Sequence, residues 1–208
     1  KSITTTNFSF TIGDDAYIVL AFNDPEDALI DQLLKESSGA RHTFVLTHGP
    51  LLPYDAGSCR WFFHGGKSAE ETAARRHFRE AFAKRNAICI CGHIHTTELA
   101  DWQGDGGRIT QMTVNSVWSQ PELGNYTVTA DQPQDFGKRH QAALSQKKED
   151  GSNYEDESDL LNEYKPGLKR YVRSTSAGSY KMNVSDRHVT IDFYAGNSQA
   201  ISKRFELR

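Results

Sequence analysis

Apolar residues occupy every second position from Phe8 to Ile12, and a Gly-Asp-Asp turn then leads into the continuous apolar stretch 16–22, AYIVLAF. Alternation with a period of two is typical of a half-buried strand, and a short apolar run bounded by turn residues is typical of a buried one. The pattern predicts a hairpin that enters a buried sheet. A helix start signal at Asp24-Pro25, followed by apolar residues at helical spacing, predicts one amphipathic helix next.

The stretch from 42 to 91 predicts a strand, a helix and a second strand. The short β-rich runs 42–47 and 87–91 lie on either side of an apolar stripe with helical spacing, which Ser68 and Glu71 open with a capping-box pattern. Strand, helix and strand in this order predict a parallel crossover. Because the carboxyl ends of parallel strands share one edge of a sheet, we expect the loops after the two strands to lie side by side.

The second half of the chain predicts further strands around one polar region. The runs ELADW and RITQMTV flank the turn QGDGG and are typical of a hairpin, and the runs SYKMNV, HVTIDFY and AISKRFEL predict three antiparallel strands at the end. Residues 119–169 carry dense charge and little periodicity, so we interpret them as a polar insertion of loops and one exposed helix that forms a solvated surface excursion. Together the elements predict a single domain over residues 1–208 with a mixed α/β (α+β) fold.

Composition agrees with one ordinary globular domain and excludes several classes of protein. The 208 residues are 37% hydrophobic, which is enough for one sizeable core. The formal net charge is only -3 and basic residues are interspersed with acidic ones, so no nucleic-acid-binding surface is evident. No apolar stretch approaches the roughly 20 residues of a membrane helix. Three cysteines do not fix the redox compartment, and the localisation stays open.

Three histidines are the candidate chemistry of the sequence. His93 and His95 form a Gly-His-x-His pattern directly after the run 87–91, and His48 follows the run 42–47 at a Gly-Pro turn. Two imidazoles two residues apart in an extended segment point the same way, and neutral imidazole is the commonest side-chain ligand for borderline metal ions. Alone, the pair is equally consistent with two surface histidines. Three histidines at neighbouring strand ends favour a metal site.

The ordered set LTHGP, a crossover helix, ICICGHIH and VNSVW resembles the calcineurin-like metallophosphoesterase superfamily, over most of the chain apart from residues 119–169. The resemblance implies a β-sandwich flanked by helices that holds two divalent or trivalent metal ions, Mn, Fe or Zn, and hydrolyses a phosphate-ester substrate. By the same resemblance, His48 and His93 bind one metal ion and His95 binds the other.

The sequence departs from that family in its acidic motifs. The expected Asp-x-His, Gly-Asp-x-x-Asp and Gly-Asn-His motifs have no counterpart upstream of the first hairpin. We therefore expect this chain to be the carboxy-terminal two thirds of such a domain, with a missing N-terminal segment of the same domain as its partner, and we assign no catalytic acid. Two alternatives stay open: an inactive binding module of the same fold, and a structural zinc site that uses Cys91 with the histidines.

Other candidate residues lie in loops at the same predicted edge. Arg60 and His64 belong to an aromatic and glycine-rich loop after His48, where their side chains are suited to a substrate phosphate. Asn115 follows the strand RITQMTV and is a third candidate for substrate binding. The alternative for each is a plain structural role in a packed loop or a turn.

Overall fold

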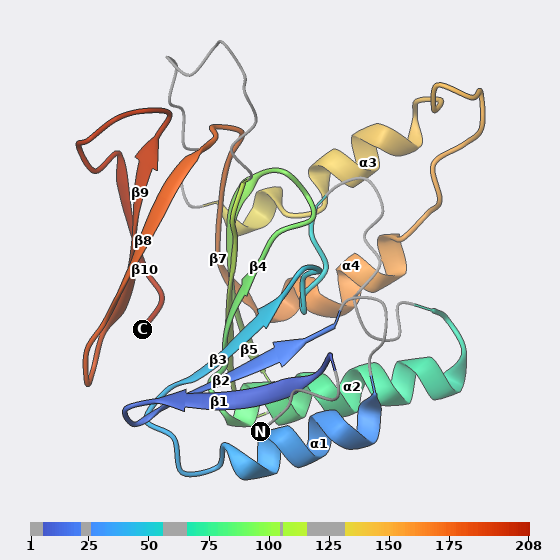
Figure 1. Cartoon of the computed structure of the whole chain (residues 1–208). Helices are drawn as coiled ribbons and strands as arrows, with labels where there is room; N and C mark the ends of the chain where they lie inside the picture. The colour runs from blue at the N-terminus through green and yellow to red at the C-terminus, as the bar shows by residue number, and fades with distance from the viewer. Residues whose placement is uncertain (1–5, 22–25, 56–65, 105, 116–131) are drawn as a thin grey trace.

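A mixed seven-stranded sheet lies between a layer of helices and a smaller three-stranded sheet (Figure 1). The computed structural model describes residues 6–21, 26–55, 66–104, 106–115 and 132–208. This arrangement confirms the predicted mixed α/β class. The structure does not describe Asp24-Pro25, so that helix start signal lies outside the described residues.

The large sheet places four strand ends at one edge. Strands β2, β3, β4 and β6 are parallel neighbours, while β1, β5 and β7 are antiparallel to the strands beside them. The carboxyl ends of the four parallel strands therefore meet at the same edge, as the sequence predicted for β3 and β4. In the order β1-β2-β3-β4-β6-β5-β7, the strand bounds are Phe8–Ile12, Asp15–Leu20, Thr43–Thr47, Ile88–Cys91, Gly107–Thr113, Thr97–Gly104 and Leu168–Ser174.

Helices α1 (Asp27–Glu36) and α2 (Ala69–Lys84) cover one face of this sheet (Figure 1). The predicted capping box at the start of α2 is confirmed, because the Ser68 hydroxyl accepts a hydrogen bond from the Glu71 main-chain N–H at 3.1 Å. Apolar side chains of both helices, among them Ile30 and Phe78, pack with the sheet in one buried cluster. None of the helices in the described ranges is long and apolar enough to cross a membrane.

The other face of the large sheet is covered by the small sheet of β8 (Gly178–Val184), β9 (Val189–Ala195) and β10 (Lys203–Glu206). Its strands are antiparallel in the order β10-β9-β8, which confirms the three predicted strands. A second buried cluster joins the two sheets. Its members are Tyr17, Phe44, Ile88, Leu99, Met112 and Val172 on the large sheet, Val189, Ile191, Phe193, Ala195 and Phe205 on the small one, and Leu207 after β10.

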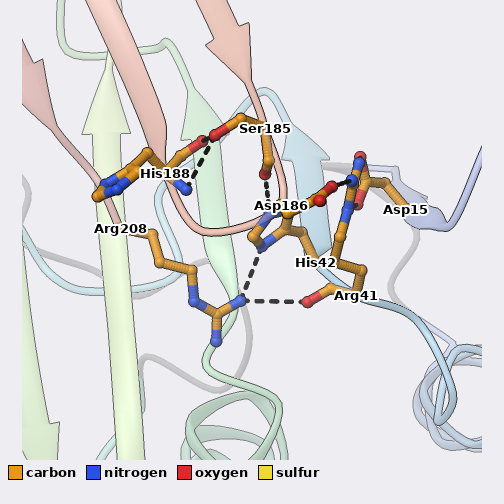
Figure 2. A network of polar contacts seen from close by, with 7 residues as sticks. All are labelled: Asp15, Arg41, His42, Ser185, Asp186, His188 and Arg208. Atoms are coloured by element: carbon orange, nitrogen blue, oxygen red, sulfur yellow. Dashed lines mark hydrogen bonds and ion pairs between the residues drawn. The ribbon is translucent and has the colours of Figure 1, made fainter.

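A polar network links the small sheet to the large one at the opposite, amino end of β3 (Figure 2). Arg41 bridges Asp15 and Asp186. The His42 ring contacts the Ser185 carbonyl oxygen through Nε2 at 2.8 Å and an Arg208 guanidinium nitrogen through Nδ1 at 2.9 Å. A carbonyl only accepts and a guanidinium only donates, so His42 is neutral with its proton on Nε2.

The interpretation of residues 119–169 as a solvated excursion is wrong for the part that the structure describes. Residues 132–167 form two helices, α3 (Lys138–Leu144) and α4 (Ser158–Tyr164), each beside a short 3-10 turn (Pro133–Asp135 and Lys165–Gly167). Four apolar side chains of this region, Phe136, Leu160, Leu161 and Tyr164, are buried in the helix-side core. The charged residues are concentrated in the exposed connection between α3 and α4. In the sequence, this dense charge masked the apolar face of the two helices. Residues 168–174 then form β7, which the sequence analysis did not predict.

Candidate metal centre

His48 and His93 meet at the carboxyl edge of the large sheet. His48 directly follows β3 and His93 lies two residues beyond β4. The two turns are joined by a hydrogen bond from the Gly92 N–H to the His48 carbonyl oxygen, 3.0 Å long. The rings stand nearly perpendicular, with His93 Nδ1 3.2 Å from His48 Nε2. The predicted convergence of these two histidines is confirmed.

The backbone around His93 is strained. His93 has φ of +72° and His95 has φ of +52°, a region that favours glycine. The Ile94 N–H donates to the Gly92 carbonyl oxygen at 2.9 Å, which closes a three-residue turn centred on His93. The expectation of an extended Gly-His-x-His segment is therefore wrong, and the positive φ falls on the histidines instead of Gly92. Strain of this kind costs on the order of 1–3 kcal/mol and is concentrated at functional sites.

The electrostatics of the site favour the neutral form of His93. Partial burial, together with the charges that His48 and His95 would carry, lowers the pKa of His93. Neutral imidazole is the form that binds metal ions. Two ligand nitrogens on one ion, with metal–nitrogen bonds of about 2.0–2.1 Å, lie roughly 2.9–3.4 Å apart. The 3.2 Å between His48 Nε2 and His93 Nδ1 fits that spacing.

His95 is exposed at the far end of the same turn. The charge that His95 would carry contributes to the lowered pKa of His93. Within the described residues, no group of three or more histidine, cysteine, aspartate or glutamate side chains is placed to hold a metal ion. The imidazole pair thus fits part of one ion's coordination shell, and the binding of a second ion by His95 stays a prediction.

Both described cysteines behave as small apolar residues. Cys89 and Cys91 are buried in the helix-side core. The Cys91 sulfur lies 3.4 Å from the Thr113 hydroxyl, beneath the histidine turn. These positions support an interior packing role and do not favour the alternative of a zinc site that uses Cys91.

The segment Gly49–Asp55 lies beside the histidines and was missed by the sequence analysis. All of its residues are buried, and the Tyr54 ring meets the His93 ring edge-on, with centroids 6.4 Å apart. The signal in the sequence was the pattern Gly-Pro-Leu-Leu-Pro-Tyr, in which two prolines restrict a short apolar stretch. A rigid apolar segment directly after a candidate ligand indicates a wall of the site.

The three predicted substrate residues have different outcomes. Arg60 and His64 lie outside the described residues. Asn115 follows β6 at the same edge as the histidines and is buried. Its main-chain N–H donates to the Tyr180 hydroxyl at 3.0 Å and its side-chain amide donates to the Thr175 carbonyl oxygen at 3.2 Å. The structure thus gives Asn115 contacts toward the small sheet, and substrate binding by all three residues stays a prediction.

Two buried carboxyl groups, Asp55 and Glu98, lie near this edge on the side that faces the helices. Burial raises the pKa of Glu98 to about 7, with a smaller raising contribution from the nearby Asp55 and against the lowering effect of Arg139 and Arg173. The Tyr171 hydroxyl donates to Asp55 at 3.4 Å and also bonds to Glu98. No local pattern in the sequence marks this cluster, because its members come from separate elements.

Comparisons with known proteins identify no family. No protein-family model and no curated protein matches the sequence. Among solved structures, "GAP50 the anchor in the inner membrane complex of Plasmodium" is 12% identical with a TM-score of 0.45 and covers 97% of this chain and 53% of that chain. "Structure of PhoD" is 12% identical with a TM-score of 0.48 and covers 96% of this chain and 40% of that chain. The chain thus spans about half of either protein or less, and likenesses this distant assign no function.

Proposed function

We propose that this chain supplies the histidine ligands of a metal-dependent phosphoesterase, in which His48 and His93 bind one metal ion and His95 binds a second. The observation that carries the proposal is the 3.2 Å separation of His48 Nε2 and His93 Nδ1 at the carboxyl edge of a parallel sheet. The substrate class, a phosphate ester, rests on the resemblance of the histidine motifs to calcineurin-like metallophosphoesterases.

Two further properties support metal binding by this pair. The lowered pKa of His93 favours its neutral imidazole, which is the form that binds metal ions. The left-handed conformations of His93 and His95 fix the turn at a cost in stability, which is expected where a fixed geometry is useful. When bound, two metal ions would supply Lewis-acid activation of the phosphoryl group and a hydroxide at neutral pH.

The remaining ligands of the proposed centre are acidic. The resemblance implies aspartates, and we propose that a further segment of the same domain brings them to the exposed side of the histidine pair. His48 and His93 then act as the fixed half of the site, because their turns are joined by the hydrogen bond between Gly92 and His48.

A second candidate is a binding module that has this fold without the metal centre. It is favoured by the lack, among described residues, of any group of three metal-binding side chains. The two candidates differ in one measurable property, since only the phosphoesterase binds metal ions stoichiometrically through its histidines.

The test measures metal content and hydrolysis in the intact protein. Mass spectrometry of the purified protein should find Mn, Fe or Zn, and the loaded protein should cleave p-nitrophenyl phosphate or its diester. His93→Ala should lose both metal and turnover, and His95→Ala should lose turnover. His188→Ala is the matched control, because His188 is also exposed but lies in the β8–β9 turn.

Metal-free protein that binds no Mn, Fe or Zn on titration would exclude the phosphoesterase and leave the binding module. Full activity in both His93→Ala and His95→Ala would show that any hydrolysis takes place elsewhere.

A further inference from the structure

The segment Gly49–Asp55 is attached to the rest of the fold on both sides of Tyr54. It starts directly after His48 and crosses the helix-facing side of the sheet edge, with Leu51 and Leu52 buried in the helix-side core. Two of its residues are prolines, which lack an N–H, so its backbone can make few hydrogen bonds of its own. The bonds that it does make identify what holds it.

The first anchor is the side chain of Gln111 on β6. Its Oε1 accepts a hydrogen bond from the Leu52 N–H at 2.8 Å, and its Nε2 donates to the Leu52 carbonyl oxygen at 3.2 Å. Gln111 is only 1% exposed, in a layer made largely of apolar side chains. A buried amide in such a layer is costly unless both of its ends are bonded. Here the backbone of Leu52 bonds both ends.

The second anchor is the carboxylate of Asp55, which is 2% exposed. Its Oδ1 accepts from the Arg139 N–H at 3.1 Å, and the N–H groups of Gly137 and His140 also bond to it. Asp55 thus caps the start of α3 from a distant part of the chain, and a carboxylate there also complements the helix dipole. The hydroxyl of Tyr171 adds a fourth donor at 3.4 Å.

Tyr54 lies between these anchors, and its ring is the wall against which the His93 ring stands. We propose that Gln111 and Asp55 are positioning residues of the histidine centre. By holding the segment on both sides of Tyr54, they restrict the His93 ring to the orientation in which Nδ1 faces His48 Nε2. This inference rests on the proposed metal function for its use, but the ring geometry that it concerns exists without metal.

The first measurement uses metal-free, intact protein with labelled histidine. A nuclear Overhauser contact between the ring protons of His48 and His93 should be present in the wild type. It should be lost or strongly reduced in Gln111→Met and in Asp55→Asn. Thr110→Val, which removes a buried hydroxyl one residue away on β6, and Asp15→Asn, which alters a buried carboxylate at the opposite edge, should retain it.

The second measurement is the affinity for cobalt(II), a spectroscopic stand-in for Zn. Residues that orient metal ligands typically change affinity by 10–100-fold, so Gln111→Met and Asp55→Asn should bind cobalt at least about ten-fold more weakly, and both controls within about two-fold of the wild type. The free energy of unfolding of each variant separates positioning from general destabilisation. If test and control variants lose the same stability but only the test variants lose cobalt affinity, the two anchors act by positioning the histidine.

Wild-type ring contact and affinity in both Gln111→Met and Asp55→Asn would overturn the inference. If either variant does not fold, Tyr54→Leu decides, because it removes the wall and leaves both anchors; an unchanged ring contact there also overturns the inference. A wild type that shows the ring contact but binds no cobalt refutes the metal function alone, and the ring contact then decides the inference.

Discussion

Replacing His93 by glycine is expected to leave a more stable protein than replacing it by alanine. Both substitutions remove the same imidazole, so the difference between them reports only on the backbone. At φ of +72°, an L-residue costs about 1–2 kcal/mol relative to glycine. Glycine loses about 0.5–1 kcal/mol more conformational freedom on folding. The expected net advantage of glycine is therefore about 0–1.5 kcal/mol, centred on about 0.75 kcal/mol.

Equilibrium unfolding in urea measures this difference as a shift of the midpoint at constant slope. The control is the same pair of substitutions at His188, which is exposed and is not among the described residues with positive φ. There the usual order holds, and alanine should be the more stable by about 0.5–1 kcal/mol. If alanine at position 93 is more stable than glycine by as much as at position 188, the turn around His93 is not strained and the reasoning from strain to function is refuted.

Three further outcomes are expected. The pKa of Glu98 is about 7 in the folded state against 4.5 ordinarily, so between these pH values the folded state holds a proton that the unfolded state releases. The stabilisation that comes from protonated Glu98 is therefore complete below pH 4.5 and is lost as the pH rises to 7. In denaturant titrations, the free energy of unfolding of Glu98→Gln relative to that of the wild type should therefore increase by up to about 3 kcal/mol between about pH 4.5 and 8. A difference between the two proteins that does not change with pH contradicts this. Ser68→Ala should lower the free energy of unfolding by about 1 kcal/mol, because it removes the cap of α2, and thermal unfolding at matched pH checks it. Nitrogen chemical shifts of His42 should show the neutral form protonated on Nε2 at pH 7.5; the other tautomer contradicts the network in Figure 2.

The parts of the fold that the sequence predicted are those governed by local periodicity. The strands β3 and β4 are short apolar runs that end at glycine, and the capping box marks the start of α2. From these elements the parallel crossover follows, and from the crossover the approach of His48 to His93. That chain of inference needs only spacing and the geometry of parallel strands.

The parts that could not be predicted depend on contacts between distant residues. Strand β7 reads LKRYVRS, and its three basic residues hide the apolar positions Leu168, Tyr171 and Val172 that face the two cores. The Gly-His-x-His pattern predicted an extended segment, whereas the hydrogen bond from the Ile94 N–H to the Gly92 carbonyl oxygen closes a turn in which His93 has a positive φ. The link from Gln111 to Leu52 spans 59 positions and leaves no local pattern.

Strand β1 has a practical consequence for handling the protein. It is the outermost strand of the described sheet on its side, it carries no charged residue, and Phe10 and Ile12 on it are 39% and 61% exposed. The rings of Phe10, Tyr17 and Phe44 stack in a row from this edge into the interior. An uncharged apolar edge invites strand-to-strand aggregation in concentrated solution, and a lysine at position 12 is the simplest protection. Samples for spectroscopy or crystallisation therefore benefit from that substitution, which lies at the opposite end of β2 from the histidine edge.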